Sequence, residues 1–201
     1  MMTWPSVDLA TLATIGVAAV LIAVLLLLWR WYRRAKARAA LLAAVTGGAF
    51  EYLRDVLVPD GQGTLLHLDF LLLTVRGAVI IDLRNVAGNI FGGDQMTEWT
   101  VMHRDQRTTF TNPQPGLYDR IAAVRALVNE LPIDGRVVFR PTGRFPKGLP
   151  RHTLMLESLT AEYPAMDRQA LGPLLESWLP EWQRIRAACE PSSMVAPRAA
   201  I

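Results

Sequence analysis

The stretch that decides the fold runs from residue 66 to residue 85 and reads LHLDFLLLTVRGAVIIDLRN. Two strongly apolar runs lie on either side of Thr74-Val75-Arg76-Gly77, a tetrapeptide that suits a type I turn with glycine at the fourth position. A β-hairpin folded about this turn pairs residues whose numbers add up to 151. We therefore predict two adjacent antiparallel strands in the interior of the domain.

The charged residues of this hairpin are expected to lie on one face. The register places Asp69 opposite Asp82 and His67 opposite Arg84, and side chains alternate between the two faces of a strand. The Cβ atoms of the two aspartates would then be about 5 Å apart. Like charges directly opposite each other are destabilising, so the pair requires a bound cation, a shared proton or a nearby arginine.

The composition describes a chain that can bury a substantial core. Of its 201 residues 51% are apolar, and the single Cys189 excludes an intrachain disulfide framework and a multi-cysteine zinc site. Five basic residues lie between Arg30 and Arg38, whereas the remainder from Ala39 onward carries 16 basic and 17 acidic residues. The folded part is therefore not a polybasic nucleic-acid binder.

An uninterrupted run of 20 uncharged residues extends from Leu9 to Leu28. A helix of this length spans about 30 Å, the thickness of the hydrocarbon layer of a bilayer. Aromatic and basic residues follow from Trp29 to Arg33, so the positive-inside rule predicts a translocated N-terminus and a domain that faces the cytoplasm of the cell. We expect a retained single-pass anchor in the plasma (inner) membrane, in contact with membrane lipid.

The chain divides into five predicted parts. They are an extracytoplasmic N-terminus (1–8), a transmembrane helix (9–29), a basic juxtamembrane helix or linker (30–47), a folded domain (48–188) and a flexible tail (189–201). Within the domain, apolar spacing predicts helices at 50–57, at 117–131 and after Pro173, and strands at 99–101, 108–111, 136–139 and 152–156 beside the hairpin. This order indicates an α/β or α+β fold with helices packed on a mixed sheet.

Several motifs in fixed order resemble the nuclease-related domain (NERD) family. They are a strand with Asp69, a strand that reads Ala-Val-Ile-Ile-Asp-Leu-Arg-Asn from residue 78, the glycine turn around Ile90, Trp99, and Asn112-Pro113 before a helix. The resemblance covers about residues 48–159. It implies a PD-(D/E)xK fold, which is restriction-endonuclease-like, with a mixed sheet flanked by helices. Many members are bacterial, and some carry a transmembrane helix. The excess of Arg over Lys and the abundant Ala also fit a GC-rich bacterial genome.

Carried over position by position, the resemblance makes Asp69 the first metal-binding acid and Asp82 the second. Arg84 stands in place of the family's lysine, and Glu51 on the preceding predicted helix would be a further acid. The implied activity is Mg²⁺-dependent hydrolysis of DNA or RNA phosphodiesters. Oxygen ligands from two carboxylates suit Mg²⁺, and a cation two residues along the strand stabilises developing charge on the phosphate.

Two departures from the family pattern leave alternatives open. Asp82-x-Arg84 replaces Glu-x-Lys, and a guanidinium stabilises charge but does not readily act as a base. The family's glutamine after Asn-Pro has no clear counterpart, because Gln114 follows Pro113 immediately. Arg84 could instead bridge both carboxylates without a metal, and Glu51 could be a solvent-facing residue. The domain is then either a hydrolase, weakened or intact, or a non-catalytic module that binds nucleic acid or protein at the membrane.

Overall fold

The structure, a computed structural model, describes residues 9–165 and 172–192, in two compact units, 1–43 and 44–201. The first unit consists of most of helix α1 (Leu9–Thr46). In the part of the chain that the structure describes, no helix has both the length and the apolar character to cross a membrane. The predicted transmembrane span falls in α1, and the structure does not describe the side chains of residues 9–14 and 16. Residues 1–8 and 193–201 of the two predicted terminal segments also lie outside them.

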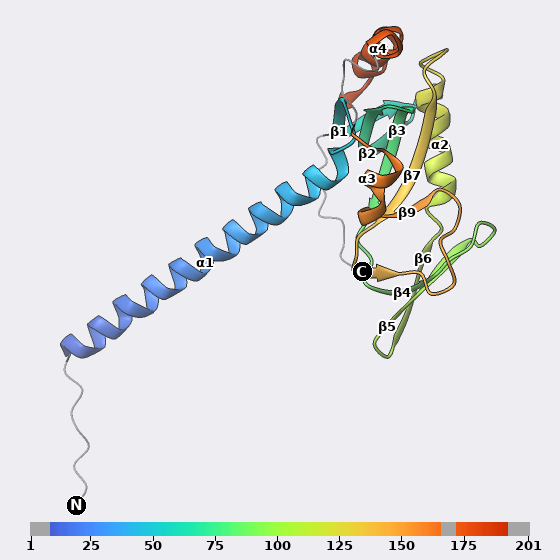
Figure 1. Ribbon diagram of the computed structural model, residues 1–201. Coiled ribbons are helices and arrows are strands. Elements are labelled where there is room, and N and C mark those ends of the chain that lie inside the picture. Colours follow the sequence, from blue (N-terminus) through green and yellow to red (C-terminus); the bar gives the residue numbers. More distant parts are fainter. Residues whose placement is uncertain (1–8, 166–171, 193–201) are drawn as a thin grey trace, which may run out of the picture. The chain divides into compact units, whose positions relative to one another are not determined.

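The second unit contains a six-stranded mixed sheet in the order β10-β1-β2-β3-β7-β9 (Figure 1). Neighbours from β10 to β3 are antiparallel, and β3, β7 and β9 are parallel. Its strands are β1 (Glu51–Pro59), β2 (Leu65–Thr74), β3 (Gly77–Arg84), β7 (Ile133–Phe139), β9 (Thr153–Met155) and β10 (Glu190–Pro191). The parallel pair β3 and β7 needs a long crossover, which carries four further elements.

The predicted hairpin register is confirmed in the strand pairs from Thr74 with Gly77 to Phe70 with Ile81. In the turn, the Thr74 hydroxyl donates to the Gly77 carbonyl at 2.9 Å and accepts the Arg76 N–H at 3.2 Å. Gly77 has φ +108°, and a Cβ there would collide with the Pro132 carbonyl, so glycine is required. The apolar residues on both faces of the hairpin are buried, which explains its nearly continuous hydrophobic sequence.

Helices cover both faces of this sheet. Helix α2 (Gln114–Arg125) lies along one side, where Gly135 of β7 leaves room for Leu117 and Ile121 (Figure 1). On the other side Val45, at the end of α1, lines a small hollow with Leu72 and with Leu159 of α3 (Leu159–Glu162). A 3-10 turn (Leu156–Ser158) leads into α3, and α4 (Gly172–Ala188) contributes further residues to the core. The domain is thus mixed α/β, as predicted.

A second sheet, in the order β6-β5-β4-β8, is built mainly from the crossover. Its strands are β4 (Gly88–Phe91), β5 (Glu98–His103), β6 (Gln106–Thr111) and β8 (Gly143–Arg144). Trp99 of β5 is fully buried and stacks on Phe139 of β7 with ring centroids 6.1 Å apart, which joins the two sheets. The strands predicted at 99–101 and 108–111 are therefore confirmed.

The predicted helix at residues 50–57 is wrong, because these residues form β1. Short apolar runs can satisfy helical and strand spacing together. Here Val56 and Val58 point into the core, and the strand finds partners in both β2 and β10. The other predicted helices and strands exist with shifted ends. Helix α2, for example, begins at Gln114 and ends at Arg125 rather than running from 117 to 131.

Helix α2 gives way to a loop whose backbone is held by one carboxylate. Glu181 of α4 accepts the N–H groups of Asn129 and Glu130 at 3.1 Å each, and that of Leu131. Burial raises the pKa of the Glu181 carboxyl, but these backbone donors outweigh burial, so the pKa lies below its ordinary value. The interaction is present above about pH 4.5 and is lost as the pH falls through the lowered pKa.

We expect Glu181→Ala to lower the free energy of unfolding by about 2 kcal/mol, because the buried N–H of Leu131 and the partly buried N–H groups of Asn129 and Glu130 lose a charged acceptor. Urea denaturation of the full chain at neutral pH measures this effect. Glu176→Ala on an exposed part of the same helix is the matched control and should change stability by less than about 0.5 kcal/mol. The difference between the two variants should shrink below pH 4, and a difference that is constant with pH would contradict the assignment.

Candidate functional site

Three aspartates lie in a row across the antiparallel strands β1, β2 and β3. The register of β1 with β2 places Asp55 beside Asp69. The register of β2 with β3 continues from the pair Phe70 and Ile81 to Asp69 beside Asp82. The sequence predicted the second of these neighbours but not the first. Such a row requires compensating cations or donors, because like charges on adjacent strands repel.

Asp69 is fixed by the backbone of the neighbouring strand. Its Oδ2 accepts the N–H of Leu83 at 2.9 Å. The backbone pairing of β2 with β3 ends at Phe70 and Ile81, and beyond that pair this side-chain bond replaces a backbone bond. Its Oδ1 lies 3.5 Å from Nδ1 of His67, and the side chain is only 10% exposed. One oxygen is thus used for anchoring, and the other faces the imidazole.

Asp55, His67 and Asp69 form a group that can hold a metal ion. One ligand atom from each residue lies within 4.8 Å of the others, and His67 Nε2 is 3.7 Å from Asp55 Oδ1. Asp55 adopts φ +51° inside β1, a left-handed conformation that non-glycine residues rarely take, although Asp and Asn tolerate it better than most. Its carbonyl accepts the Ser192 N–H at 2.9 Å. This kink places the Asp55 carboxylate beside His67.

Asp82 pairs with two arginines. It is 2% exposed, and its Oδ2 lies 2.6 Å from Arg84 and 3.4 Å from Arg120 of α2. Arg120 also donates from Nε to the carbonyl oxygen of His67 at 2.7 Å, which ties α2 to β2. Arg120 was not predicted from the sequence. A signal existed, because Arg120 follows the buried Leu117 by three residues and therefore faces the sheet.

The structure brings the two predicted acids, Asp69 and Asp82, close together, but each contacts a different set of residues. Asp69 and Asp82 line one small hollow with His67, Ile80, Ile81 and Arg120. On one side of this hollow Asp69 faces His67, which leads on to Asp55. On the other side Asp82 holds Arg84 and Arg120. A group of residues that can hold a metal ion thus lies next to an ion cluster with two arginines.

Glu51 does not join the acids, because it begins β1 rather than lying on a helix. It is four residues from Asp55, which corresponds to about 13 Å along an extended strand. Its Oε2 accepts the indole N–H of Trp182 at 2.8 Å. The structure therefore places Glu51 at the contact between β1 and α4, away from the predicted site.

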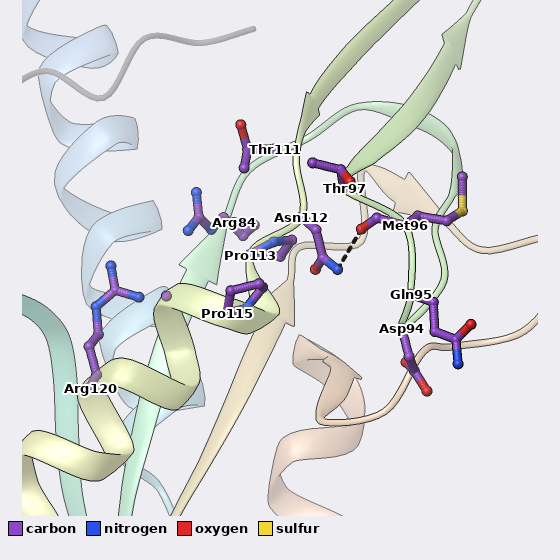
Figure 2. A pocket seen from close by; sticks show the side chains of 11 residues that line it. Arg84, Asp94, Gln95, Met96, Thr97, Thr111, Asn112, Pro113, Pro115 and Arg120 are labelled. Atoms are coloured by element: carbon purple, nitrogen blue, oxygen red, sulfur yellow. Dashed lines mark hydrogen bonds between the residues drawn. The ribbon is translucent and has the colours of Figure 1, made fainter.

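A cleft of about 490 Å³ lies beside the two arginines (Figure 2). Behind its lining, the buried Gln114 donates to Asp94 at 2.9 Å and to the Arg151 carbonyl at 2.7 Å. Hydrogen bonds from Gln114 and from the Arg151 backbone lower the pKa of the Asp94 carboxyl below its ordinary value. Asn112 donates to the Met96 carbonyl at 2.8 Å. These contacts fix the loop from Asp94 to Thr97 against the first turn of α2.

Comparison with known proteins identifies the family of the chain. The family model described as "Nuclease-related domain" matches residues 31–140, more than half of the chain, so the chain belongs to the nuclease-related domain family. An uncharacterized protein of Bacillus anthracis is 24% identical over 114 residues, which cover 56% of this chain and 54% of that protein. The match thus spans about half the length of this curated relative. No solved structure matches.

We expect Asp82→Asn to lower the free energy of unfolding by about 2 kcal/mol, because two largely buried guanidinium groups lose their counter-charge. The expected loss is below the full cost of breaking a buried ion pair, since both arginines keep some exposure to solvent. Asp55→Asn, at a half-exposed position where Asn also tolerates the backbone, should cost less than about 1 kcal/mol. Urea unfolding measures both, and equal effects would contradict the buried ion cluster.

Proposed function

We propose that this domain is a metal-dependent phosphodiester hydrolase that acts on nucleic acid, with a PD-(D/E)xK nuclease-like active site at the hairpin. One observation supports this most strongly. Carboxylates and an imidazole that can hold a cation lie next to two arginines that can bind a phosphate, in a chain of the nuclease-related domain family. Hydrolysis of a phosphodiester needs both halves, a cation and positive charge for the phosphate oxygens.

The donor set supports a divalent ion and modifies the predicted ligands. Asp69 and His67 would be the central ligands, with Asp55 completing the group and Asp82 facing them across the hollow. Mg²⁺ was expected from an all-carboxylate site, whereas a mixed oxygen and nitrogen set favours Mn²⁺. When bound, the ion supplies Lewis-acid polarisation of the phosphate and activation of water.

Two arginines of the chain would bind and stabilise the negative charge of the substrate phosphate. Asp82 holds Arg84 and Arg120 in place and balances one of their two positive charges. A phosphodiester anion that enters the site would compete with Asp82 for these guanidinium groups, since arginine matches phosphate geometry with two parallel donors. Both arginines would then stabilise the charge that develops on the phosphate, and neither is asked to remove a proton.

Calorimetry and cleavage assays on the full chain test this function. The wild type should bind Mn²⁺ more tightly than Mg²⁺ and should nick a labelled DNA or RNA strand in the presence of Mn²⁺. Asp69→Asn should abolish both signals, because it removes a central ligand charge, whereas Asp105→Asn on an exposed turn should change neither. If the wild type neither binds a divalent ion nor cleaves any nucleic acid, the proposed hydrolase is wrong.

A non-catalytic interaction module is the second candidate function. The observation that favours it is the contact of 2.6 Å between Arg84 and Asp82, with Arg120 beside it, because this ion cluster neutralises an acid without any metal. A module of this kind would bind nucleic acid or protein without hydrolysing it. Binding of nucleic acid in the wild type with no metal-dependent cleavage would support it.

We further propose that α1 anchors the domain to the plasma (inner) membrane, with the domain on the cytoplasmic side. The run of uncharged residues from Leu9 to Leu28 and the basic residues after it support this proposal. Among the described side chains of this helix, Leu21 and Leu25 are 58% and 64% exposed, and exposed leucines of this kind suit a lipid environment.

The full chain should therefore float with membranes in a density gradient after washing at high pH. The double substitution Leu21→Arg and Leu25→Arg should move it to the soluble fraction, because each arginine at the centre of a span costs about 2.5–3.5 kcal/mol. Arg34→Ala and Arg38→Ala, in the basic segment, form the matched control and should not release the protein. Wild-type protein that remains entirely in the wash would rule the anchor out.

A further inference from the structure

The cleft beside the arginines has features that the proposed chemistry does not use. It lies between the loop that carries Met96 and Thr97, the end of β6 at Thr111, and the first turn of α2. Its volume of about 490 Å³ is within the range of about 300–1,000 Å³ that small-molecule sites occupy. The hydrogen bonds of Asn112 and Gln114 hold its walls, so the space is formed before any ligand arrives.

One end of the cleft is cationic. Arg84 of β3 and Arg120 of α2 both line it, and their side chains lie on the same side of the first turn of the helix (Figure 2). They are recessed, with 30% and 19% of their side-chain area exposed. Within the residues that the structure describes, Nε of Arg84 is buried without a hydrogen-bond acceptor, so a ligand in the cleft would meet the exposed part of this side chain and not Nε.

The remaining lining mixes polar residues with the apolar rings of two prolines. Pro113 and Pro115 line the cleft from the start of α2, and Met96 lines it from the opposite loop (Figure 2). Proline rings offer apolar surface against which the face of a base can pack, and a contact of this kind does not read the identity of the base. The acidic residue in the cleft, Asp94, is already paired with Gln114 and Arg151, which reduces its repulsion of an anion.

We propose that this cleft binds one unpaired nucleotide, with its phosphate at Arg84 and Arg120 and its base against Pro113 and Pro115. The inference rests on the proposed function and specifies its substrate class, because it makes an unpaired strand, rather than a continuous duplex, the preferred ligand. A base stacked inside a duplex cannot enter a cleft of this size. The recessed arginines likewise favour the flexible backbone of a single strand. The same chemistry is offered by a free nucleoside monophosphate.

Gly116 provides a matched pair of variants for the test. It lines the cleft within α2, and a Cβ at this position would lie 3.5 Å from Nη1 of Arg120, an ordinary contact. Gly116→Ala therefore leaves the cleft open, whereas Gly116→Trp fills it beside the arginine. Thr97→Trp fills the cleft from the opposite, exposed wall and serves as an independent second variant should Gly116→Trp disturb the helix.

Fluorescence anisotropy of the full chain in EDTA measures binding without cleavage. The probes are a labelled oligothymidylate and a labelled blunt DNA hairpin, with unlabelled thymidine monophosphate as competitor. We expect the single strand to bind at least tenfold more tightly than the hairpin, Gly116→Trp and Thr97→Trp to weaken it at least tenfold, and Gly116→Ala to stay within twofold. If thymidine monophosphate competes at concentrations similar to those at which the single strand binds, the site is supported and its ligand is a free nucleotide. If thymidine monophosphate competes only weakly, the ligand is the single strand.

Equal binding of the hairpin and the single strand would overturn the inference, and so would unchanged binding in both tryptophan variants. These results are separable from the test of hydrolysis. Cleft-dependent binding of the strand without cleavage in Mn²⁺ would overturn the hydrolase and support this site. Cleavage in Mn²⁺ that both tryptophan variants retain undiminished would support the hydrolase and overturn this site.

Discussion

The structure depends on one buried carboxylate. Asp82, at 2% exposure in the middle of the sheet, is compensated by guanidinium groups from its own strand and from α2. Burying a charge is costly unless it is paired and hydrogen-bonded, so the position of α2 and the position of Asp82 constrain each other. The same constraint places two arginines beside Asp69 and His67, where a cation can bind, and at one end of the cleft.

The hairpin explains why the site lies where it does. Its apolar residues are buried on both faces and fix the register, and the register in turn places Asp69 and Asp82 on neighbouring strands. Asp69 accepts a backbone N–H from Leu83. At this point, where the candidate site residues begin, a side-chain hydrogen bond replaces the backbone pairing of the two strands. The stability of the core and the geometry of the site therefore have a common origin in about 20 residues.

These physical relations also explain what the sequence could predict. The turn at Gly77, the hairpin register and the mixed α/β architecture followed from turn chemistry and apolar patterns, which are local. Residues 50–57 were predicted to form a helix. They form the strand β1 because they pair with β2 and β10, and this tertiary pairing is not visible in the local sequence pattern. For the same reason Glu51 was assigned to the site, although it lies at the contact with α4, and the kinked Asp55 and Arg120 were missed.

The proposed chemistry requires that the imidazole of His67 and the carboxylate of Asp69 hold one divalent ion. Electron spin-echo envelope modulation of Mn²⁺ added to the full chain probes these ligands, because the method detects nitrogen nuclei bound to the ion. We expect modulation from a single imidazole nitrogen, absent in His67→Gln and unchanged in His103→Gln. Bound Mn²⁺ that shows no nitrogen modulation, or modulation that persists in His67→Gln, would mean that His67 is not a ligand.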